Sequence, residues 1–195
     1  IFLKVYQPCA QYHRGAAPRQ TKLKPLVTGS PWERLSVDIT GPHPRSRNGY
    51  QYMLTAVDHF TKWAEAYPLR NHSAPQVAKT LVTQLICRFG CPKQILSDQG
   101  PEFIGQLMTE LCRSFGIDKG RTSAYKASTN GAVERFHRTL NSMLGKVVAE
   151  HQRDWDTWLP LVMAAHRASP HADTKVSRNK LMFGHEVTMP VDIAL

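Results

Sequence analysis

Apolar and polar residues alternate over residues 33–40, where Leu35, Val37 and Ile39 are separated by Ser36 and Asp38. A period of two predicts a strand with one buried face. Asn48-Gly49 then gives a strong hairpin signal before the next apolar segments. In all, we expect strands within five ranges: 33–40, 50–60, 62–69, 94–100 and 117–125.

Helical periodicity occupies most of the remaining chain. In residues 73–90, apolar side chains recur every fourth position, Ser73 is a candidate N-cap and Gly90 a candidate C-terminal stop. Further helices are expected over the ranges 105–116, 130–151 and 154–168. Three strands in a meander, followed by alternating helices and strands, predict an α/β protein with a mixed five-stranded sheet flanked by helices.

The amino-acid composition indicates which class of molecule the protein binds. Among 195 residues there are 25 Lys and Arg against 15 Asp and Glu, a formal net charge of +10. A basic domain of this size most often binds a polyanion, with nucleic acid as the first candidate; a ribosomal or merely soluble basic protein is the alternative. Four scattered cysteines indicate an intracellular, reduced protein, and no apolar run approaches the roughly 18 residues that span a membrane.

The two ends of the chain differ in composition from its middle. We expect residues 1–24 to be a basic arm, residues 25–186 the folded core, and residues 187–195 a C-terminal linker. The chain starts at Ile1 and shows no signal peptide of the usual form, so we interpret it as a fragment or a processed product.

Three carboxylates stand out by their positions. Asp38 lies within an apolar strand, Asp98 follows the segment Gln94–Leu96, and Glu134 lies on a helix, with 35 residues between Asp98 and Glu134. The predicted core-facing residues of that helix are Val133, Phe136, Leu140, Leu144 and Val147. Glu134 falls at the margin of this apolar seam, from which it can face the strand ends.

Converging carboxylates repel one another unless a cation neutralises them, and oxygen ligands suit Mg²⁺ or Mn²⁺. Two such ions are the usual device for phosphoryl transfer. The alternative is that these carboxylates have only structural roles, since an Asp at a strand end often forms a turn and a Glu beside Arg on a helix is usually a surface pair.

The ordered motifs SVDITGPHP, VDHFTKWAEAYPL, FGCPKQILSDQGPEF, TSAYKASTNGAVERFHRTL, WLPLVMAAHRASPH and KLMFGHE resemble the integrase catalytic core of gypsy-type long-terminal-repeat retrotransposons and their retroviral relatives. The resemblance covers about residues 25–190 and implies an RNase H-like fold. It assigns the catalytic and metal-binding roles to Asp38, Asp98 and Glu134. It also implies 3′-end processing and strand transfer of DNA with two Mg²⁺ or Mn²⁺ ions, self-association, and action in the nucleus.

Some positions depart from the family pattern. Lys126 and Ala127 replace a common His-Pro pair, while Lys175 and Arg178 replace a Gly and a Pro of a later segment. The upstream Cys-x-x-Cys pair of the family is reduced to Cys9, so we expect no bound zinc. These departures keep open a catalytically decayed or host-captured DNA-binding protein. A nuclease of the same fold that only hydrolyses is a third possibility.

Several polar residues around the carboxylates are candidate DNA contacts. The five predicted here are Gln99, Lys126, Asn130, Arg135 and Arg138. Lys and Arg neutralise phosphates, and a helix side that carries them beside a metal site would guide a strand into it. For each residue taken alone, a solvated surface position is the competing interpretation. We expect Cys87, Cys91 and Cys112 to lie in or near the core.

Overall fold

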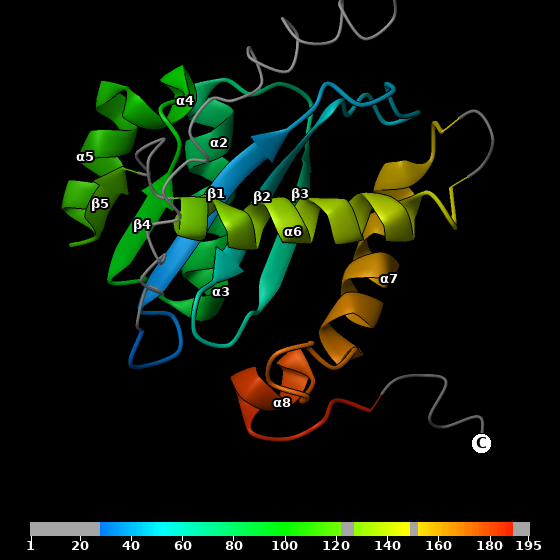
Figure 1. Ribbon diagram of the computed structural model, residues 1–195. Coiled ribbons are helices and arrows are strands. Elements are labelled where there is room, and N and C mark those ends of the chain that lie inside the picture. Colours follow the sequence, from blue (N-terminus) through cyan, green and yellow to red (C-terminus); the bar gives the residue numbers. More distant parts are fainter. Residues whose placement is uncertain (1–27, 122–126, 149–151, 189–195) are drawn as a thin grey trace, which may run out of the picture.

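A mixed sheet forms the centre of the protein, for which a computed structural model describes residues 28–121, 127–148 and 152–188 (Figure 1). Its strands are β1 (Arg34–Thr40), β2 (Tyr52–Asp58), β3 (Ala64–Leu69), β4 (Gln94–Ser97) and β5 (Asp118–Arg121). They lie in the order β3-β2-β1-β4-β5. The pairs β1–β2 and β2–β3 are antiparallel, whereas β1–β4 and β4–β5 are parallel. The predicted mixed five-stranded sheet is confirmed.

Helices cover both faces of this sheet. The helical elements are α2 (Ala74–Thr80), η1 (Leu81–Ile86), α3 (Cys87–Phe89), α4 (Pro101–Ile104), α5 (Gln106–Ser114), α6 (Ala127–Leu144), α7 (Trp155–Ala168) and α8 (Arg178–Phe183). Figure 1 shows α6 crossing one face of the sheet, with α2 and α5 behind the other. None of the helices formed by the described residues is both long and apolar enough to cross a membrane.

Strand alternation divides the apolar residues between two cores. Leu35 and Val37 of β1 pack with α2, η1 and α5 on one face. On the other face, Met53 and Val57 of β2 pack against α6 and α7. Because successive strand residues point to opposite faces, Asp38 is directed toward the α6 side of the sheet.

The long helix predicted over residues 73–90 contains an irregular segment. Leu81–Ile86 is a π-helical stretch between α2 and α3, a form that arises where a helix accommodates an extra residue. Ser73 makes no side-chain capping bond; its hydroxyl donates instead to Asn71 Oδ1 at 2.6 Å. Pro75 lies in the first turn, where a proline is tolerated because that turn needs no N–H donor.

Other differences from the sequence predictions concern ends and surfaces. The helix predicted to reach residue 151 ends at Leu144, so Val147 is exposed rather than part of the core seam. Cys112 is buried, but Cys87 and Cys91 are exposed, which corrects the expectation that they lie near the core. The short helices α4 and α8 have too few residues for a periodic pattern to predict them.

Candidate active site

Two neighbouring parallel strands place Asp38 and Asp98 side by side. In the β1–β4 ladder, Ser36 pairs with Leu96. Asp38 and Asp98 each follow these partners by two residues, so they reach the same height at the carboxyl ends of the strands. Ligands of α/β sheets bind at such strand ends.

Helix α6 adds the third carboxylate from above this edge. Val133, Phe136, Leu140 and Leu144 are buried against the sheet, as the apolar seam predicts. Their burial fixes the rotation of the helix about its axis, so Glu134, one residue after Val133, comes to the strand ends while its carboxylate stays exposed.

The three carboxylates line one small cavity of about 50 Å³. Its walls come from β1, the end of β4 and the first half of α6, and the lining residues are Ser36, Val37, Asp38, Leu96, Ser97, Asp98, Val133 and Glu134. Residues separated by 60 and by 36 positions in the chain thus meet at one point. Their convergence is a property of the fold, and their roles remain a prediction.

Burial and neighbouring charge alter the chemistry of Asp38. The pKa of Asp38 is raised to about 6, first by burial. The backbone N–H of Ile39, which donates to Oδ1 at 2.8 Å, opposes that rise. The carboxylates of Asp98, Glu102 and Glu134 all raise the pKa further. Repulsion of this kind is what a bound divalent cation relieves.

Glu102 is a fourth carboxylate at this edge that the sequence patterns did not single out. The backbone N–H of Gly100 donates to Asp98 Oδ1 at 3.0 Å. A Cβ on Gly100 would lie 2.8 Å from Glu102 Oε1 and 3.1 Å from Asp98 Oδ1. A side chain at Gly100 would therefore require the Glu102 carboxylate to shift and would crowd that of Asp98.

The carboxylates of this cavity are suitable ligands for a hard divalent cation, although they are too far apart to bind one ion together. Carboxylate oxygens are the ligands that Mg²⁺ and Mn²⁺ prefer. Among residues 28–121, 127–148 and 152–188, no group of three or more His, Cys, Asp or Glu is arranged to hold a metal ion as it stands. Asp38, Asp98 and Glu134 share a cavity but must move closer together to share an ion.

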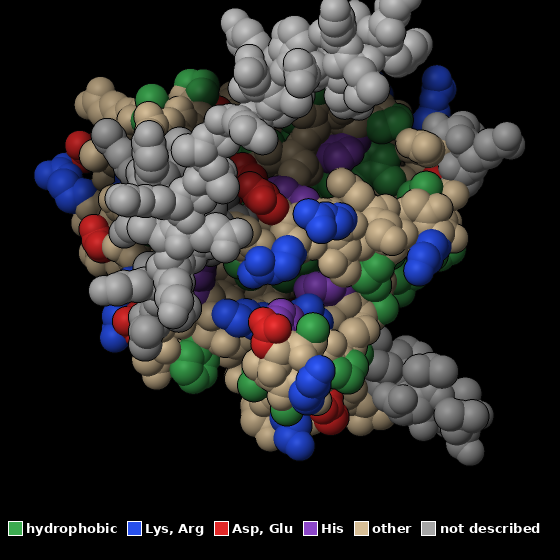
Figure 2. Space-filling model, viewed as in Figure 1, with side chains coloured by type: hydrophobic (Ala, Val, Ile, Leu, Met, Phe, Trp, Pro, Cys, Tyr) green, Lys and Arg blue, Asp and Glu red, His purple; other side chains and the backbone are tan. Residues whose placement is uncertain are grey.

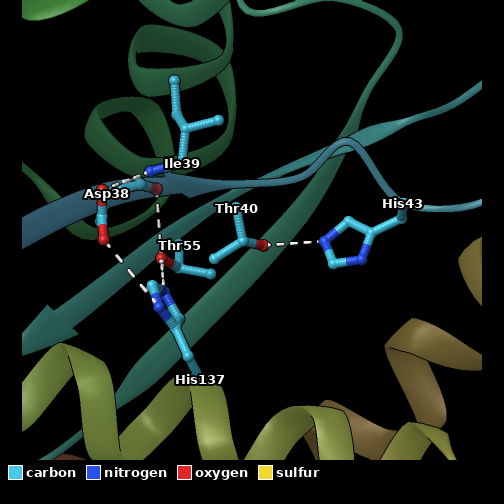
Figure 3. Close-up of polar contacts among 6 residues, drawn as sticks. All are labelled: Asp38, Ile39, Thr40, His43, Thr55 and His137. Carbon is cyan, nitrogen blue, oxygen red and sulfur yellow. Dashed lines mark hydrogen bonds and ion pairs between the residues drawn. The ribbon is translucent and has the colours of Figure 1, made fainter. Parts of the chain in front are cut away.

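His137 is a site residue that the sequence analysis missed. Its Nε2 lies 2.7 Å from Thr55 Oγ1, and its Nδ1 lies 3.9 Å from Asp38 Oδ2 (Figure 3). The Thr55 hydroxyl donates to the backbone carbonyl of Asp38 at 3.1 Å, so Nε2 is the nitrogen that donates to Thr55. Burial lowers the pKa of His137 to about 4, with a smaller contribution from His43.

This arrangement directs the unprotonated Nδ1 of a neutral imidazole toward the Asp38 carboxylate. His137 and Thr55 together hold β1 to α6 at the position of Asp38. A signal for His137 existed in the sequence, since it lies three residues after Glu134 and therefore on a neighbouring face of the same helix.

The predicted DNA contacts fall into two groups. Gln99, Arg135 and Arg138 are exposed beside the carboxylate cavity or on α6. Figure 2 shows Lys and Arg side chains next to Asp and Glu side chains along α6. Lys126 lies outside the described residues, as do Cys9 and the rest of the N-terminal arm, and the side chain of Asn130 is likewise not described. All five DNA-contact assignments, and the expected absence of zinc, stay predictions.

Comparison with known proteins gives the family. The family model described as "Integrase core domain" matches residues 30–127. The Gag-Pol polyprotein of Avian reticuloendotheliosis virus is 37% identical over 163 residues, which cover 83% of this chain and 14% of the polyprotein. The retrovirus-related Pol polyprotein from transposon 412 of Drosophila melanogaster is 32% identical over 159 residues, 82% of this chain and 13% of that protein. The chain thus spans about one seventh of these relatives.

Solved structures support the fold. The HTLV-2 integrase catalytic core domain in complex with magnesium superposes with a TM-score of 0.63 at 18% identity, over 82% of this chain and 99% of that one. A chain of a simian T-cell lymphotropic virus intasome gives a TM-score of 0.70 at 20% identity, over 89% of this chain and 63% of that chain. The RNase H-like fold implied by the motifs is confirmed. By sequence and by fold, the chain belongs to the integrase core domain family of retroviral and transposon Pol proteins.

Proposed function

We propose that this chain is the catalytic core of a retrotransposon-type integrase, which trims the 3′ ends of element DNA and joins them to target DNA. The observation that carries the proposal is the single cavity at the carboxyl ends of β1 and β4, lined by Asp38, Asp98 and Glu134. Three carboxylates in one cavity of a chain with a net charge of +10 favour metal-assisted chemistry on a polyanion.

Asp38, Asp98 and Glu134 are the residues that would hold two Mg²⁺ or Mn²⁺ ions. When bound, such ions activate a water or a DNA 3′-hydroxyl and stabilise the leaving oxygen of the phosphodiester. The protein's own contribution is positional. Burial of Val133 fixes Glu134, the Gly100 N–H orients Asp98, and Thr55 with His137 holds the strand segment that carries Asp38.

The DNA partner follows from the exposed polar and cationic side chains on α6 and next to Asp98. Arg135 and Arg138 are exposed on α6, and Gln99 is exposed next to Asp98. We propose that these residues receive the DNA backbone and the strand near its reacting phosphate. Acting on chromosomal target DNA, the protein would work in the nucleus. Self-association is part of the proposal, since the HTLV-2 integrase core is known in trimeric and dimeric forms.

Strand transfer on a branched, pre-joined oligonucleotide with Mn²⁺ tests this function with little dependence on flanking domains. The native chain should be active, and Glu134→Gln should be inactive while keeping its circular dichroism spectrum and thermal transition. Glu110→Gln is the matched control, because it removes a carboxylate from an exposed surface pair with Arg113 on α5. Equal activity of native and Glu134→Gln protein would refute the proposal. A folded native chain that binds DNA without turnover would instead indicate a decayed or host-captured DNA-binding protein.

A further inference from the structure

A second cavity lies on the other flank of α6, away from the carboxylates. Its volume is about 230 Å³. It is enclosed by α6, the ends of β2 and β3 with the turn between them, the end of α7 and the segment leading into α8. The charged and histidine side chains that line it are Lys62, Arg135, His166, His171, Asp173 and Arg178. Figure 2 shows Lys, Arg and His side chains gathered on this face next to α6.

The charge of this cavity is opposite to that of the first. Among the described residues that line it, Lys62, Arg135 and Arg178 are permanent cations, and Asp173 is the single carboxylate. These cations come from three separate parts of the chain. Since like charges repel, a fold that collects them around one concave surface favours an anion there.

Arg178 is held at the cavity wall with donors to spare. Its Nη1 donates to the backbone carbonyls of His166 at 2.9 Å and Ser169 at 3.0 Å. Within the described part of the chain, no hydrogen bond uses its Nη2 or Nε. A guanidinium fixed in this way presents a preorganised fork, the geometry that recognises phosphate oxygens.

Lys62 and His166 bring further polar groups to the same surface. The Lys62 ammonium donates one proton to the His59 carbonyl at 2.6 Å and has two others. His166 is only 4% exposed, and its Nδ1 has no hydrogen-bond partner within the described residues. A buried polar atom without a partner is uncommon in folded proteins and points to a missing contact.

The charges of all these cations affect the pKa of one histidine, His171. The pKa of His171 is lowered first by burial and next by Arg178, with smaller contributions in the same direction from Lys62 and Arg135. Asp173, 3.9 Å from His171 Nδ1, opposes the shift. Four charged groups therefore act on a single position in the cavity, which makes His171 a natural reporter of any anion that binds there.

We propose that this cavity is a phosphate-binding site, in which Arg135, Arg178 and Lys62 bind the phosphoryl oxygens of a DNA backbone phosphate or of a small free phosphate compound. Only the DNA source rests on the proposed function. In that case a strand would be held on one flank of α6 while the reacting phosphodiester lies at the carboxylates on the other flank. Arg178 stands where the resembled family often has proline, so this fork is a feature of this chain.

Side-chain ¹H–¹⁵N NMR of the histidines tests the site on the full chain without metal. The probes are inorganic phosphate, pyrophosphate and a short DNA duplex, each titrated at constant ionic strength. The His171 signal, assigned with His171→Gln, should shift saturably. Arg135→Gln should weaken the binding by up to about fivefold, and Arg135 can be replaced without disturbing the core because it is exposed on α6.

Two further variants make the test specific. Lys180→Gln removes the same charge from an exposed position of α8 that does not line the cavity, and it should leave the affinity unchanged within about twofold. Asp173→Asn removes the single carboxylate and should strengthen binding about threefold. Arg178→Gln is less suitable, since Arg178 also bonds to the end of α7.

Each outcome bears on the site separately from catalysis. A saturable shift with DNA alone supports the site and identifies a backbone phosphate as its ligand. A shift with phosphate or pyrophosphate alone supports the site with a free compound. The proposal is overturned if no probe shifts His171, or if Arg135→Gln and Lys180→Gln bind equally well. If the chain catalyses strand transfer but binds none of the probes, the phosphate site is refuted and the proposed function stands. If the chain binds phosphate but is inactive, the proposed function is refuted and the phosphate site stands.

Discussion

The two flanks of α6 carry opposite charge although their key residues are adjacent in sequence. Glu134 lines the acidic cavity at the strand ends, and Arg135 lines the cationic cavity beyond the helix. Successive helical residues point about 100° apart, so one turn of α6 serves both cavities. Between them the buried Val133 and Phe136 each line one cavity and separate the two.

This difference shows how a protein with a net charge of +10 maintains an acidic site. The carboxylates are gathered by strand ends and one helix position, where burial and mutual repulsion favour a cation. The cations are gathered by the turn between β2 and β3 and by the helices α6 and α8 on the opposite flank. The DNA substrate proposed above would use both environments, because positive charge would bind its backbone and metal ions would assist its reaction.

The largest expected effect is on catalysis at the acidic flank, the side of α6 with the cavity lined by Asp38, Asp98 and Glu134. Asp98→Asn should lower strand transfer on the branched substrate by on the order of 10³-fold or more, because it removes a carboxylate that would hold the metal. Binding of the same DNA without metal should change less than about twofold, since the cationic flank is intact. Gel-based strand transfer and fluorescence anisotropy measure the two quantities. Comparable losses of turnover and of binding would show that the flanks do not act separately.

Phe136, which lies between the two cavities, should contribute a large share of the free energy of unfolding. Phe136 is 5% exposed and its ring lies 5.1 Å from that of His166. Phe136→Ala should lower the free energy of unfolding by about 3–5 kcal/mol, through lost burial and a residual cavity. Urea denaturation measures the loss. Thr139→Ala, exposed on the same helix, is the control and should change stability by less than about 1 kcal/mol; a similar loss in both variants would contradict this account of Phe136.

Metal should stabilise the acidic flank in proportion to its occupancy. At Mg²⁺ or Mn²⁺ concentrations a hundred times the dissociation constant, a ligand that binds only the folded state adds about 2.7 kcal/mol. Thermal unfolding with and without metal tests this, and the gain should disappear in Asp98→Asn. Arg135→Gln, on the other flank, should keep the full gain. A metal-induced shift that survives in Asp98→Asn would place the ion elsewhere.

Acid should destabilise the protein through the cationic flank. The pKa of His166 is lowered to about 3, first by burial and then by Arg178 and Arg167. Above pH 6.5 the imidazole is neutral in both states. Between pH 6.5 and 3 the unfolded chain binds a proton that the folded chain excludes, so stability falls as pH falls, by up to about 1.4 kcal/mol per pH unit from this group.

Urea midpoints measured from pH 7.5 to 4.5 should therefore show a shallower slope for His166→Gln than for the native chain. His59 and His137, whose pKa values are about 4 for the same reason of burial, contribute to the slope that remains. His72→Gln changes an exposed histidine and should leave the slope as it is in the native chain. Identical slopes for the native chain and His166→Gln would remove His166 from this explanation.

The smallest effect should come from a single surface charge on the cationic flank. Arg135→Gln should weaken DNA binding by less than about 1 kcal/mol at 0.15 M salt. It should also reduce the dependence of log K on log salt concentration by about one unit. Arg113→Gln on α5, where Arg113 pairs with Glu110, should leave that slope unchanged. Equal slopes for both variants would mean that Arg135 does not contact the DNA.

Much of the fold could be predicted because period-two and period-four patterns are local. The strand at 33–40, the seam of α6 from Val133 to Leu144 and the helix beginning near residue 154 were predicted to within a few residues. Local patterns failed where tertiary packing sets the outcome. The end of α6 at Leu144 leaves Val147 in solvent. Cys87, the first residue of α3, and Cys91, two residues after that helix, are both exposed.

By itself, the sequence determined the family resemblance and the three carboxylates, because their identities and spacing are written in the chain. Only the tertiary structure decided which other residues join them. His137 reaches Asp38 because the seam of α6 fixes the helix on β1 and β2. Lys62, Arg135 and Arg178 meet around one cavity from positions more than 40 residues apart. No periodic pattern encodes such distant contacts, since they follow from the way the helices pack on the two faces of the twisted sheet.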